Sequence, residues 1–375
     1  MSEDPRSLQR IVARLAVDSA EMARRSERQM AAWQGAAYVP IICNGEVPAA
    51  IKEALPPAAN LYDEWHSHAK TLLNGLHGVA GAVYGGSDAV PSVRANMGVG
   101  VLATFFGLKQ QVFPDKMPWI TEHISLDAAL DYDAEQSPFS ADIRIALERS
   151  AFLAEVFAGS GITPFCFDTQ GPFDLAHLAI GDEIFLALYD EAEKVHRLLN
   201  LCTRLIIRVT RSYKEAVGEP LTGGRHSNGL AMRGGVRICE DTSTLLNAEQ
   251  IAEFVVPYTR RVLQAFGGGW VHYCGKNDHL CAAVLAMPEA HGLNFGNPER
   301  HDLPAIIDVC RQRGKRLLNS PARGREEKLP DYFRRCLDYT SGTGQGLFLL
   351  WPEIRPDENA AAAAELWRAM QRQDS

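Results

Sequence analysis

One short stretch of this chain has the residue types and spacing best suited to chemistry, namely His272, Tyr273, Cys274 and Gly275. They end an apolar run that begins at Trp270 and is typical of a buried β-strand. Because side chains alternate between the two faces of a strand, His272 and Cys274 point the same way, with Cα atoms roughly 6.5–7 Å apart. An imidazole and a thiol at that spacing can reach one zinc ion, so the pattern predicts a metal site.

The same residues also fit a purely structural role. Cysteine is among the most buried residue types and often behaves as a small hydrophobe. Two ligands do not complete a zinc site, because catalytic sites usually use three protein ligands and structural sites use four. The motif alone therefore leaves metal binding and plain core packing both open.

Strands and helices must position these side chains, and from about residue 160 the chain alternates short apolar runs with longer helical patterns. The runs that we interpret as strands lie at 162–167, 235–239, 270–274, 292–295 and 316–318, with earlier candidates at 39–43 and 82–84. This alternation favours parallel strands joined by right-handed crossovers. About eight strands predict an α/β fold with a (β/α)8 TIM barrel over residues 81–375, and residues 1–80 form an N-terminal helical extension packed on it.

In such barrels the reacting groups lie at the carboxyl ends of the strands. Asp168 and Asp241 each follow an apolar strand directly, where a carboxylate without a partner is costly. We therefore expect Asp241, Glu240 and Asp168 to be the catalytic residues. The main cavity is expected to be lined by residues 168–170, 240–241, 272–274 and 343–346.

Length, composition and charge limit the possible classes of protein. The chain has 375 residues, 46% of them hydrophobic, and a mean hydropathy of -0.14. No apolar run approaches the ~20 residues of a membrane span, and the charged N-terminus lacks the apolar core of a signal peptide. A net charge of -8 argues against nucleic acid or an anionic membrane as the main partner. The eight scattered cysteines favour reduced thiols, so we expect a cytoplasmic protein.

Several segments resemble the uroporphyrinogen decarboxylase superfamily, which includes corrinoid-dependent and coenzyme M methyltransferases. The resemblance covers most of the chain from about residue 90 onward. It rests on a Gly-Pro-Phe segment at 171–173, a strand and helix start at 235–258, and a loop and helix entry at 344–359. The stretch His272-Tyr-Cys-Gly275 is similar to the His-x-Cys-Gly of the zinc methyltransferase branch, so the resemblance implies that branch.

One departure from the family concerns decarboxylation. The decarboxylases carry an arginine-rich motif near the N-terminal strand, whereas no arginine lies between Arg28 and Arg94 here. A polyanionic tetrapyrrole would then leave buried negative charge unpaired. The sequence therefore favours the methyltransferase interpretation over a uroporphyrinogen decarboxylase-type decarboxylase.

A second departure concerns the metal. Zinc methyltransferases place a third ligand, a cysteine, between the glycines that here flank Gln345, and glutamine is a poor zinc ligand. Glu240 is our first choice for the third ligand beside His272 and Cys274. Cys43 and Cys336 are the other candidates.

The resemblance implies methyl transfer between a small thiol or methylated compound and a corrinoid carried by a partner protein. Zinc would hold a thiol substrate as its thiolate, and in the reverse direction Asp241 or Glu240 would act as general acid. The expected substrate-binding residues are Gln170, Arg94, Asn96, Arg237, Asn294 and Gln345. A barrel that binds a small ligand without turnover is the non-enzymatic alternative, and a homodimer is one expected assembly.

Overall fold

The protein is seen here in a computed structural model that describes residues 4–226 and 229–373. Its main sheet contains six strands, all parallel, in the order β1-β12-β11-β10-β9-β8. The strands of this sheet are β1 (Ile41–Ile42), β8 (Val236–Cys239), β9 (Gly269–Tyr273), β10 (Ala290–Phe295), β11 (Arg316–Asn319) and β12 (Leu347–Leu350). The predicted α/β class with parallel strands is confirmed.

A second parallel pair is formed by β2 (Ser92–Arg94) and β5 (Thr163–Phe165). An isolated bridge between Gln170 and Cys239 joins the chain after β5 to β8. On the other side, the amide of Asp88 donates to the carbonyl of Ile41 in β1 at 2.8 Å. Within the described residues the ladders of these eight strands do not form one closed ring, so the pairing alone does not establish the predicted closed (β/α)8 barrel.

Two short antiparallel pairs complete the strands. They are β3 (Gln110–Gln111) with β4 (Trp119–Ile120), and β6 (Gly223–His226) with β7 (Leu230–Arg233). The strand predicted at 82–84 is wrong, because these residues end helix α5 (His68–Tyr84). Its buried positions, such as Leu72, Leu76 and Val79, already have helical spacing, and Ala82 continues that pattern.

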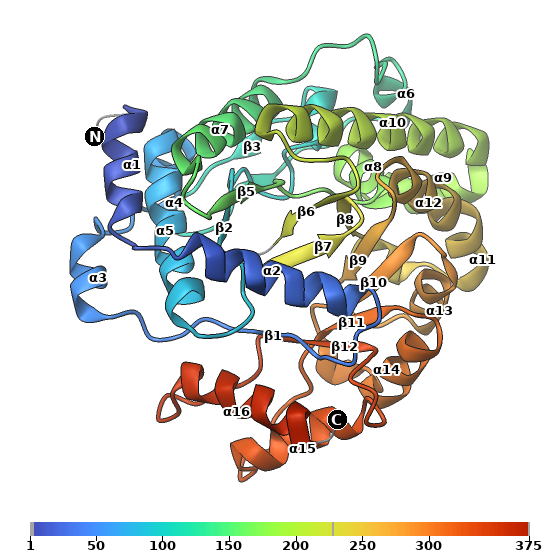
Figure 1. The fold of residues 1–375 in the computed structure, drawn as a ribbon. Coiled ribbons are helices and arrows are strands. Elements are labelled where there is room, and N and C mark those ends of the chain that lie inside the picture. Colours follow the sequence, from blue (N-terminus) through green and yellow to red (C-terminus); the bar gives the residue numbers. More distant parts are fainter. Residues whose placement is uncertain (1–3, 227–228, 374–375) are drawn as a thin grey trace.

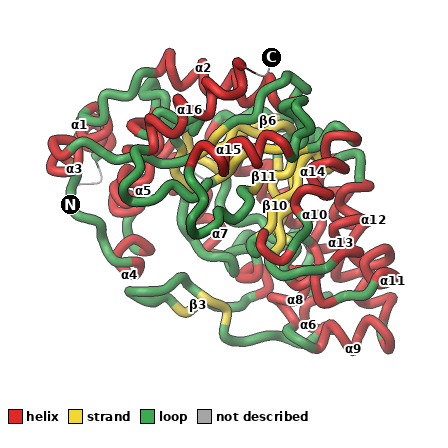
Figure 2. The backbone as a smooth tube through the Cα atoms, turned by 90° about the horizontal axis from the view of Figure 1, so that it is seen from below, coloured by secondary structure: helices red, strands yellow, loops and turns green. Residues whose placement is uncertain are grey.

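Helices surround the strands, as Figure 2 shows from below. The longer α-helices are α1 (Pro5–Ala13), α2 (Ser19–Trp33), α5, α7 (Ala141–Phe157), α8 (Pro172–Ile180), α9 (Glu183–Asp190), α10 (Ala192–Val217), α12 (Val256–Ala265), α13 (Asp278–Ala286), α14 (Leu303–Gln312), α15 (Leu329–Asp338) and α16 (Ala360–Gln373). The shorter elements are α3 (Ala49–Ala54), α4 (Leu61–Trp65), α6 (Leu126–Ala129), α11 (Ala248–Gln250), the 3₁₀ turns η1 (Ala103–Phe106), η2 (Thr242–Leu245) and η4 (Pro298–Arg300), and the π-helical turn η3 (Ile251–Val255). A capping box formed by Asn247 and Gln250 opens α11.

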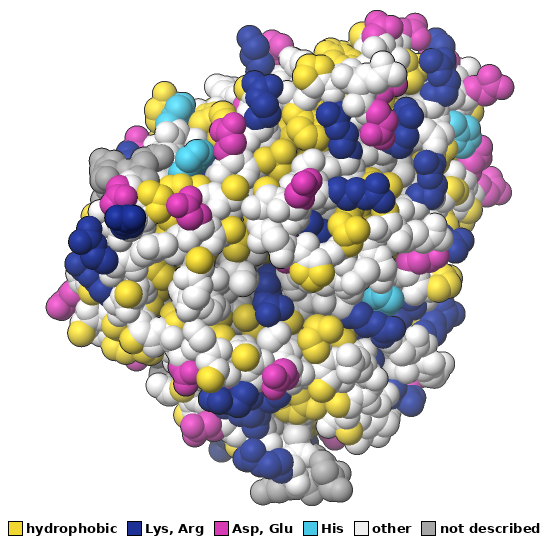
Figure 3. Space-filling view, turned by 45° about the horizontal axis from the view of Figure 1, so that its top comes forward, with side chains coloured by type: hydrophobic (Ala, Val, Ile, Leu, Met, Phe, Trp, Pro, Cys, Tyr) yellow, Lys and Arg dark blue, Asp and Glu magenta, His cyan; other side chains and the backbone are white. Residues whose placement is uncertain are grey.

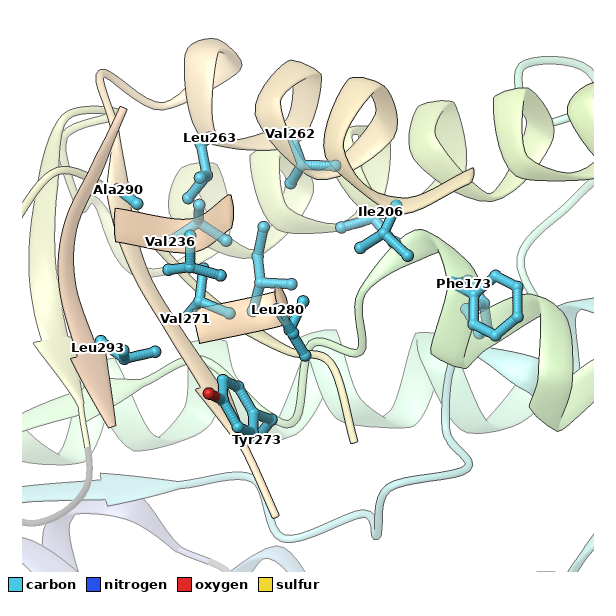
Figure 4. Packing of buried hydrophobic residues seen from close by; sticks show 14 of the residues in the cluster. Phe173, Ile206, Val236, Val262, Leu263, Val271, Tyr273, Leu280, Ala290 and Leu293 are labelled. Atoms are coloured by element: carbon cyan, nitrogen blue, oxygen red, sulfur yellow. The ribbon is translucent and has the colours of Figure 1, made fainter. Parts of the chain in front are cut away.

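The two faces of the main sheet pack against different partners. On the outer face, Val236, Val271 and Leu293 meet helix residues such as Val262 and Leu263 (Figure 4). The residues between them point to the inner face. Successive residues of each strand therefore pack against the helices on one side and line the interior on the other. Position along the strand therefore decides which side chains reach the site.

The inner face is closed at one end by helix α2, which lies across the sheet beside β7 (Figure 1). Trp33 packs with Trp270, Leu318 and Phe348, and its indole Nε1 donates to the carbonyl of Ala231 at 2.8 Å. Because β1 also comes from the first 80 residues, the N-terminal segment contributes a strand as well as the predicted helices. The division at residue 80 remains a prediction.

The surface is of mixed charge. On the face in Figure 3, Lys and Arg side chains lie interspersed with Asp and Glu. Within residues 4–226 and 229–373, no helix is both long and apolar enough to cross a membrane.

Candidate functional site

Three polar side chains stand in one row across the carboxyl ends of adjacent strands. His272 in β9 pairs in register with Cys239 in β8 and with Asn294 in β10. Residues in register on neighbouring parallel strands share a face and lie about 4.8 Å apart. The row therefore presents a thiol, an imidazole and an amide to the inner face of the sheet.

Asn294 determines which nitrogen of His272 carries the proton. The amide nitrogen Nδ2 of Asn294 donates to the carbonyl of Leu318, so its oxygen must face the other way, toward His272. The Nδ1 of His272 lies 2.5 Å from that oxygen and is therefore the donor. Nε2 therefore carries the lone pair and can accept from the Cys274 thiol, which is the tautomer of a histidine that ligates a metal.

Two groups approach the Nε2 of His272. The Sγ of Cys274 lies 3.6 Å away and an Oδ1 of Asp241 lies 3.9 Å away. Ligands at the corners of a zinc tetrahedron are about 3.5 Å apart, given bonds of about 2.0–2.3 Å. His272 and Cys274 already have this separation, so the prediction that they share a face agrees with their geometry.

Cys239 is the residue that sequence reasoning missed. Its Sγ, a carboxylate oxygen of Asp241 and a ring nitrogen of His272 all lie within 4.8 Å of one another, which makes them a possible metal-binding group among the described residues. The signal was present, because Cys239 ends the strand predicted at 235–239. Only the pairing of that strand beside β9 reveals that its thiol faces His272.

The structure does not bring Glu240 to this group. Alternation along β8 turns its side chain to the outer face, where it is fully buried against Gly171. Ser243 donates to its carboxylate at 2.6 Å, and Thr259 of α12 donates to the other oxygen. Burial raises the pKa of Glu240 to about 7. The expected role of Glu240 as third ligand does not fit this placement, and Cys239 and Asp241 are the groups that lie beside His272.

A buried carboxylate holds Asp241 in place. Asp174, at the start of α8, accepts from the amides of Asp241 and Thr242 at 2.7 and 2.9 Å. Asp241 in turn accepts from the amide of Cys274 at 2.6 Å. The chain after β8 is thus tied both to α8 and to the end of β9, so the candidate ligands have fixed positions.

The other expected third ligands lie elsewhere. Cys43 is buried beyond β1, where Ser87 donates to its carbonyl, and Cys336 is buried in α15. The loop with Gln345 precedes β12, so it lies at the opposite end of the sheet from the carboxyl ends. The Nε2 of Gln345 donates there to the carbonyl of Gly35 at 2.7 Å. The predictions that Gln345 binds substrate and that residues 343–346 line the main cavity do not fit this placement.

Asp168 lies among arginines near the same face. The Nη1 of Arg94 donates to Asp168 at 2.7 Å, and its Nη2 donates to Asn96 at 3.1 Å. The Nη1 of Arg237 is 3.7 Å from the second oxygen of Asp168, beyond hydrogen-bond distance. The carboxylate of Asp168 is therefore occupied by its ion pair with Arg94. Gln170 is buried at the bridge to β8.

A cavity of about 380 Å³ opens over the row of polar side chains. The described residues that line it are His226, Leu230, Arg237, Trp270, His272, Asn294, Phe295, Gly296, Pro298, Asn319, Ser320, Leu350 and Trp351. Of the predicted lining segments, only 272–274 contributes, through His272, whereas the segments 168–170 and 240–241 do not. Asn294 and Arg237, which we expected to bind substrate, also line the cavity. Trp351 occupies the carboxyl end of β12, which takes the place that we expected for the Gln345 loop.

Burial shifts the pKa of the His272 imidazole and of both thiols toward their uncharged forms. Burial, followed by the charge of Arg237, lowers the pKa of His272, so its imidazole is uncharged at neutral pH. Burial raises the pKa of the Cys274 and Cys239 thiols, with the carboxylate of Asp241 adding to the effect. A bound cation would lower the pKa of both thiols, because it favours the thiolate form.

Comparison with known proteins gives matches among solved structures. No protein-family model matches the chain, and no curated protein matches it. Among solved structures, a methyltransferase from Methanosarcina mazei matches over 93% of this chain and 98% of its own, with a TM-score of 0.61 and 14% sequence identity. At that identity the likeness shows a common fold, and any statement about activity depends on the site.

Proposed function

We propose that the protein is a methyltransferase of the uroporphyrinogen decarboxylase superfamily, with a parallel eight-stranded barrel and its site at the carboxyl ends of the strands. The reaction would move a methyl group between a small thiol or methylated compound and a corrinoid. One observation carries the proposal: the Nε2 of His272 lies 3.6 Å from the Cys274 thiol, and a ring nitrogen of His272, the Cys239 thiol and the Asp241 carboxylate lie within 4.8 Å of one another, beside a cavity that His272 lines. The structural neighbour from Methanosarcina mazei supports it at the level of the fold.

The donor set suits zinc. One histidine and two cysteines are a known ligand set of catalytic zinc, with a fourth position open to substrate. Here His272 and Cys239 would supply two ligands, and the third, in place of the predicted Glu240, would be Asp241, which lies within 4.8 Å of both, or Cys274, whose Sγ lies 3.6 Å from the Nε2 of His272. When bound, zinc would keep a thiol substrate as thiolate at neutral pH.

The residues around the ligands have separate tasks. Asn294 holds the ring of His272 in the tautomer that carries the lone pair on Nε2. Asp241, whose side chain is 44% exposed, stands next to the ligands and would deliver a proton to a leaving thiolate in the reverse direction. Trp270, Leu230 and Phe295 exclude water from one side of the cavity.

A corrinoid does not fit inside the protein. The macrocycle is far larger than a cavity of about 380 Å³, which has room for a small substrate. It would therefore be presented by a partner protein at the cavity mouth.

Metal analysis tests the proposal. Protein expressed with ample zinc is expected to hold about one equivalent, and Cys274→Ser and Cys239→Ser should each lose most of it. Cys202→Ser is the matched control, because Cys202 is buried in α10 and should leave the zinc content unchanged. Wild-type protein should also transfer a methyl group from methylcobalamin to a small thiol. Negligible zinc in the wild type would rule the proposal out and leave the ligand-binding barrel.

A further inference from the structure

A small chamber lies inside the protein, on the α10 side of Arg237. It is enclosed by α10, the β6–β7 pair, the start of β8 and the chain that follows β5, and its volume is about 10 Å³. That is room for one particle the size of a water molecule or a monatomic ion. The described lining residues that bear on its occupant are Cys166, Thr210, Glu219, Arg225, Met232 and Arg237.

Three of these lining residues have a buried polar atom that lacks a partner. Within residues 4–226 and 229–373, the Oγ1 of Thr210 and the Nε of both Arg225 and Arg237 make no hydrogen bond. Buried polar groups are normally satisfied, so three such atoms around one chamber indicate a shared partner. Because a guanidinium Nε can only donate, that partner must accept hydrogen bonds.

At one wall of the chamber, two cations meet one carboxylate. Glu219 accepts from the Nζ of Lys214 at 2.6 Å and from the backbone amide of Arg225 at 3.2 Å, so both of its oxygens are engaged. The side chains of Lys214 and Glu219 are only 1% and 15% exposed. The guanidinium of Arg225 makes one long contact, from Nη1 to the carbonyl of Gly224 at 3.5 Å. Lys214 therefore neutralises Glu219, and the charge of Arg225 is left over.

The other wall has the same imbalance. Asp168 accepts from Arg94 at 2.7 Å, whereas the closest nitrogen of Arg237 is 3.7 Å from it. Burial lowers the pKa of His226 and raises that of the Cys166 thiol, so neither adds a charge at neutral pH. Two guanidinium groups are thus in excess beside one small chamber, and charge of one sign is costly to bury without a counter-charge.

We propose that the chamber binds a single halide ion, chloride in ordinary buffers, held by the Nε–H groups of Arg225 and Arg237 and the hydroxyl of Thr210. A halide accepts from donors in any direction, and a carboxylate or phosphate is too large for about 10 Å³. The ion would neutralise the excess charge and fix Arg237 from behind. This inference goes beyond the proposed function and requires neither zinc nor a corrinoid.

Halide-dependent stability tests the inference. Urea unfolding would be followed in sodium gluconate, with the gluconate replaced stepwise by chloride or bromide at constant ionic strength. A ligand that binds only the folded state stabilises it as the ligand concentration rises. The unfolding midpoint should therefore rise with either halide, whereas gluconate is too large to enter the chamber. A midpoint that does not change with halide concentration would overturn the inference.

Variants assign the effect to the chamber. Arg225→Met should lose most of the halide dependence, and in gluconate it should be at least as stable as the wild type because it removes an unpaired buried charge. Thr210→Val should weaken the dependence. The controls are Thr203→Val, whose lost hydroxyl already donates to the carbonyl of Leu199, and Arg325→Met, whose side chain is 97% exposed. Full halide dependence in folded Arg225→Met would sink the inference.

Crystals grown in bromide locate the ion. Anomalous scattering should show bromide between Arg225 and Arg237, and a chamber that holds only water would contradict the inference. Halides also ligate zinc, so the unfolding series is repeated on chelator-treated protein. An equal halide effect without zinc supports the inference, and an effect that requires zinc contradicts it while leaving the proposed function intact. Halide binding in protein that never takes up zinc would support the chamber and contradict the proposed function alone.

Discussion

At the scale of single residues, the site depends on hydrogen bonds that fix one proton. His272 has a defined tautomer because Asn294 is itself oriented by the carbonyl of Leu318. A partner of this kind orients a ligating ring and raises its basicity. The amide is therefore as much a part of the candidate metal site as the thiols.

Replacement of Asn294 tests this dependence. Asn294→Leu removes the acceptor, so His272 can rotate or change tautomer, and zinc affinity is expected to fall about 10–100-fold. Asn294→Asp keeps an acceptor oxygen and should retain more of the affinity than Asn294→Leu. Chelator competition measures the dissociation constants, and equal values for wild type and Asn294→Leu would show that the amide has no role.

At the scale of elements, ion pairs fasten the chain between β11 and α15. Arg323 pairs with Glu358 through two hydrogen bonds of 2.6 and 2.7 Å, and Arg335 pairs with Glu327 at 2.8 and 2.7 Å. Glu327 also accepts from the amide of Gly324. Bidentate pairs of this type are stronger than ordinary surface ion pairs.

The Glu327 pair predicts a pH-dependent stability. Hydrogen bonds from Arg335 lower the pKa of Glu327 to about 2, from 4.5 in an unperturbed side chain. Its contribution is therefore fully present above pH 4.5 and is lost as the pH falls toward 2. Glu327→Gln should reduce the free energy of unfolding by about 1–2 kcal/mol at pH 7, after allowance for partial exposure.

Urea unfolding at several pH values measures this difference. It should shrink as the pH falls below 4.5, whereas Glu326→Gln should have little effect at any pH because both side chains of its ion pair are exposed. A Glu327→Gln difference that stayed constant down to pH 3.5 would show that the ion pair is not its source.

At the scale of the whole molecule, helix α2 closes one end of the inner face and links the N-terminal segment to the sheet. Trp33 is buried against Trp270, Leu318 and Phe348, and Arg316 of β11 donates to the carbonyl of Ala32 at 3.0 Å. The cavity therefore opens toward the carboxyl ends of the strands. The same packing supports the strand that carries His272.

Truncation of Trp33 tests this support. Trp33→Ala should lower the free energy of unfolding by about 3–5 kcal/mol, because it leaves a cavity in the core and removes the bond to Ala231. Trp119→Ala is the control: Trp119 is 55% exposed, and its loss should cost less than about 0.5 kcal/mol. Chemical denaturation gives both values, and similar losses for the two variants would contradict the role of Trp33.

The sequence by itself determined the features that depend on local periodicity. Alternation along a strand placed His272 and Cys274 on one face, and the succession of strands and helices predicted the parallel sheet. The same alternation puts Glu240 on the opposite face of the strand from Cys239 and Asp241. It does not show which of the two faces lies next to His272. The register of β8 against β9 decides that, and it depends on packing between distant parts of the chain.

Only the tertiary structure decided the remaining positions. No local sequence pattern relates Gln345 to His272. The direction of β12 places Gln345 at the far end of the sheet, whereas Trp351, after the other end of β12, lines the cavity. The pairing of Arg94 with Asp168, which leaves Arg237 in excess, likewise joins residues 74 positions apart. A sequence pattern fixes the face of a side chain, because that depends on its neighbours along the strand. Its partners across the site depend on how the whole chain closes, and no local pattern records that.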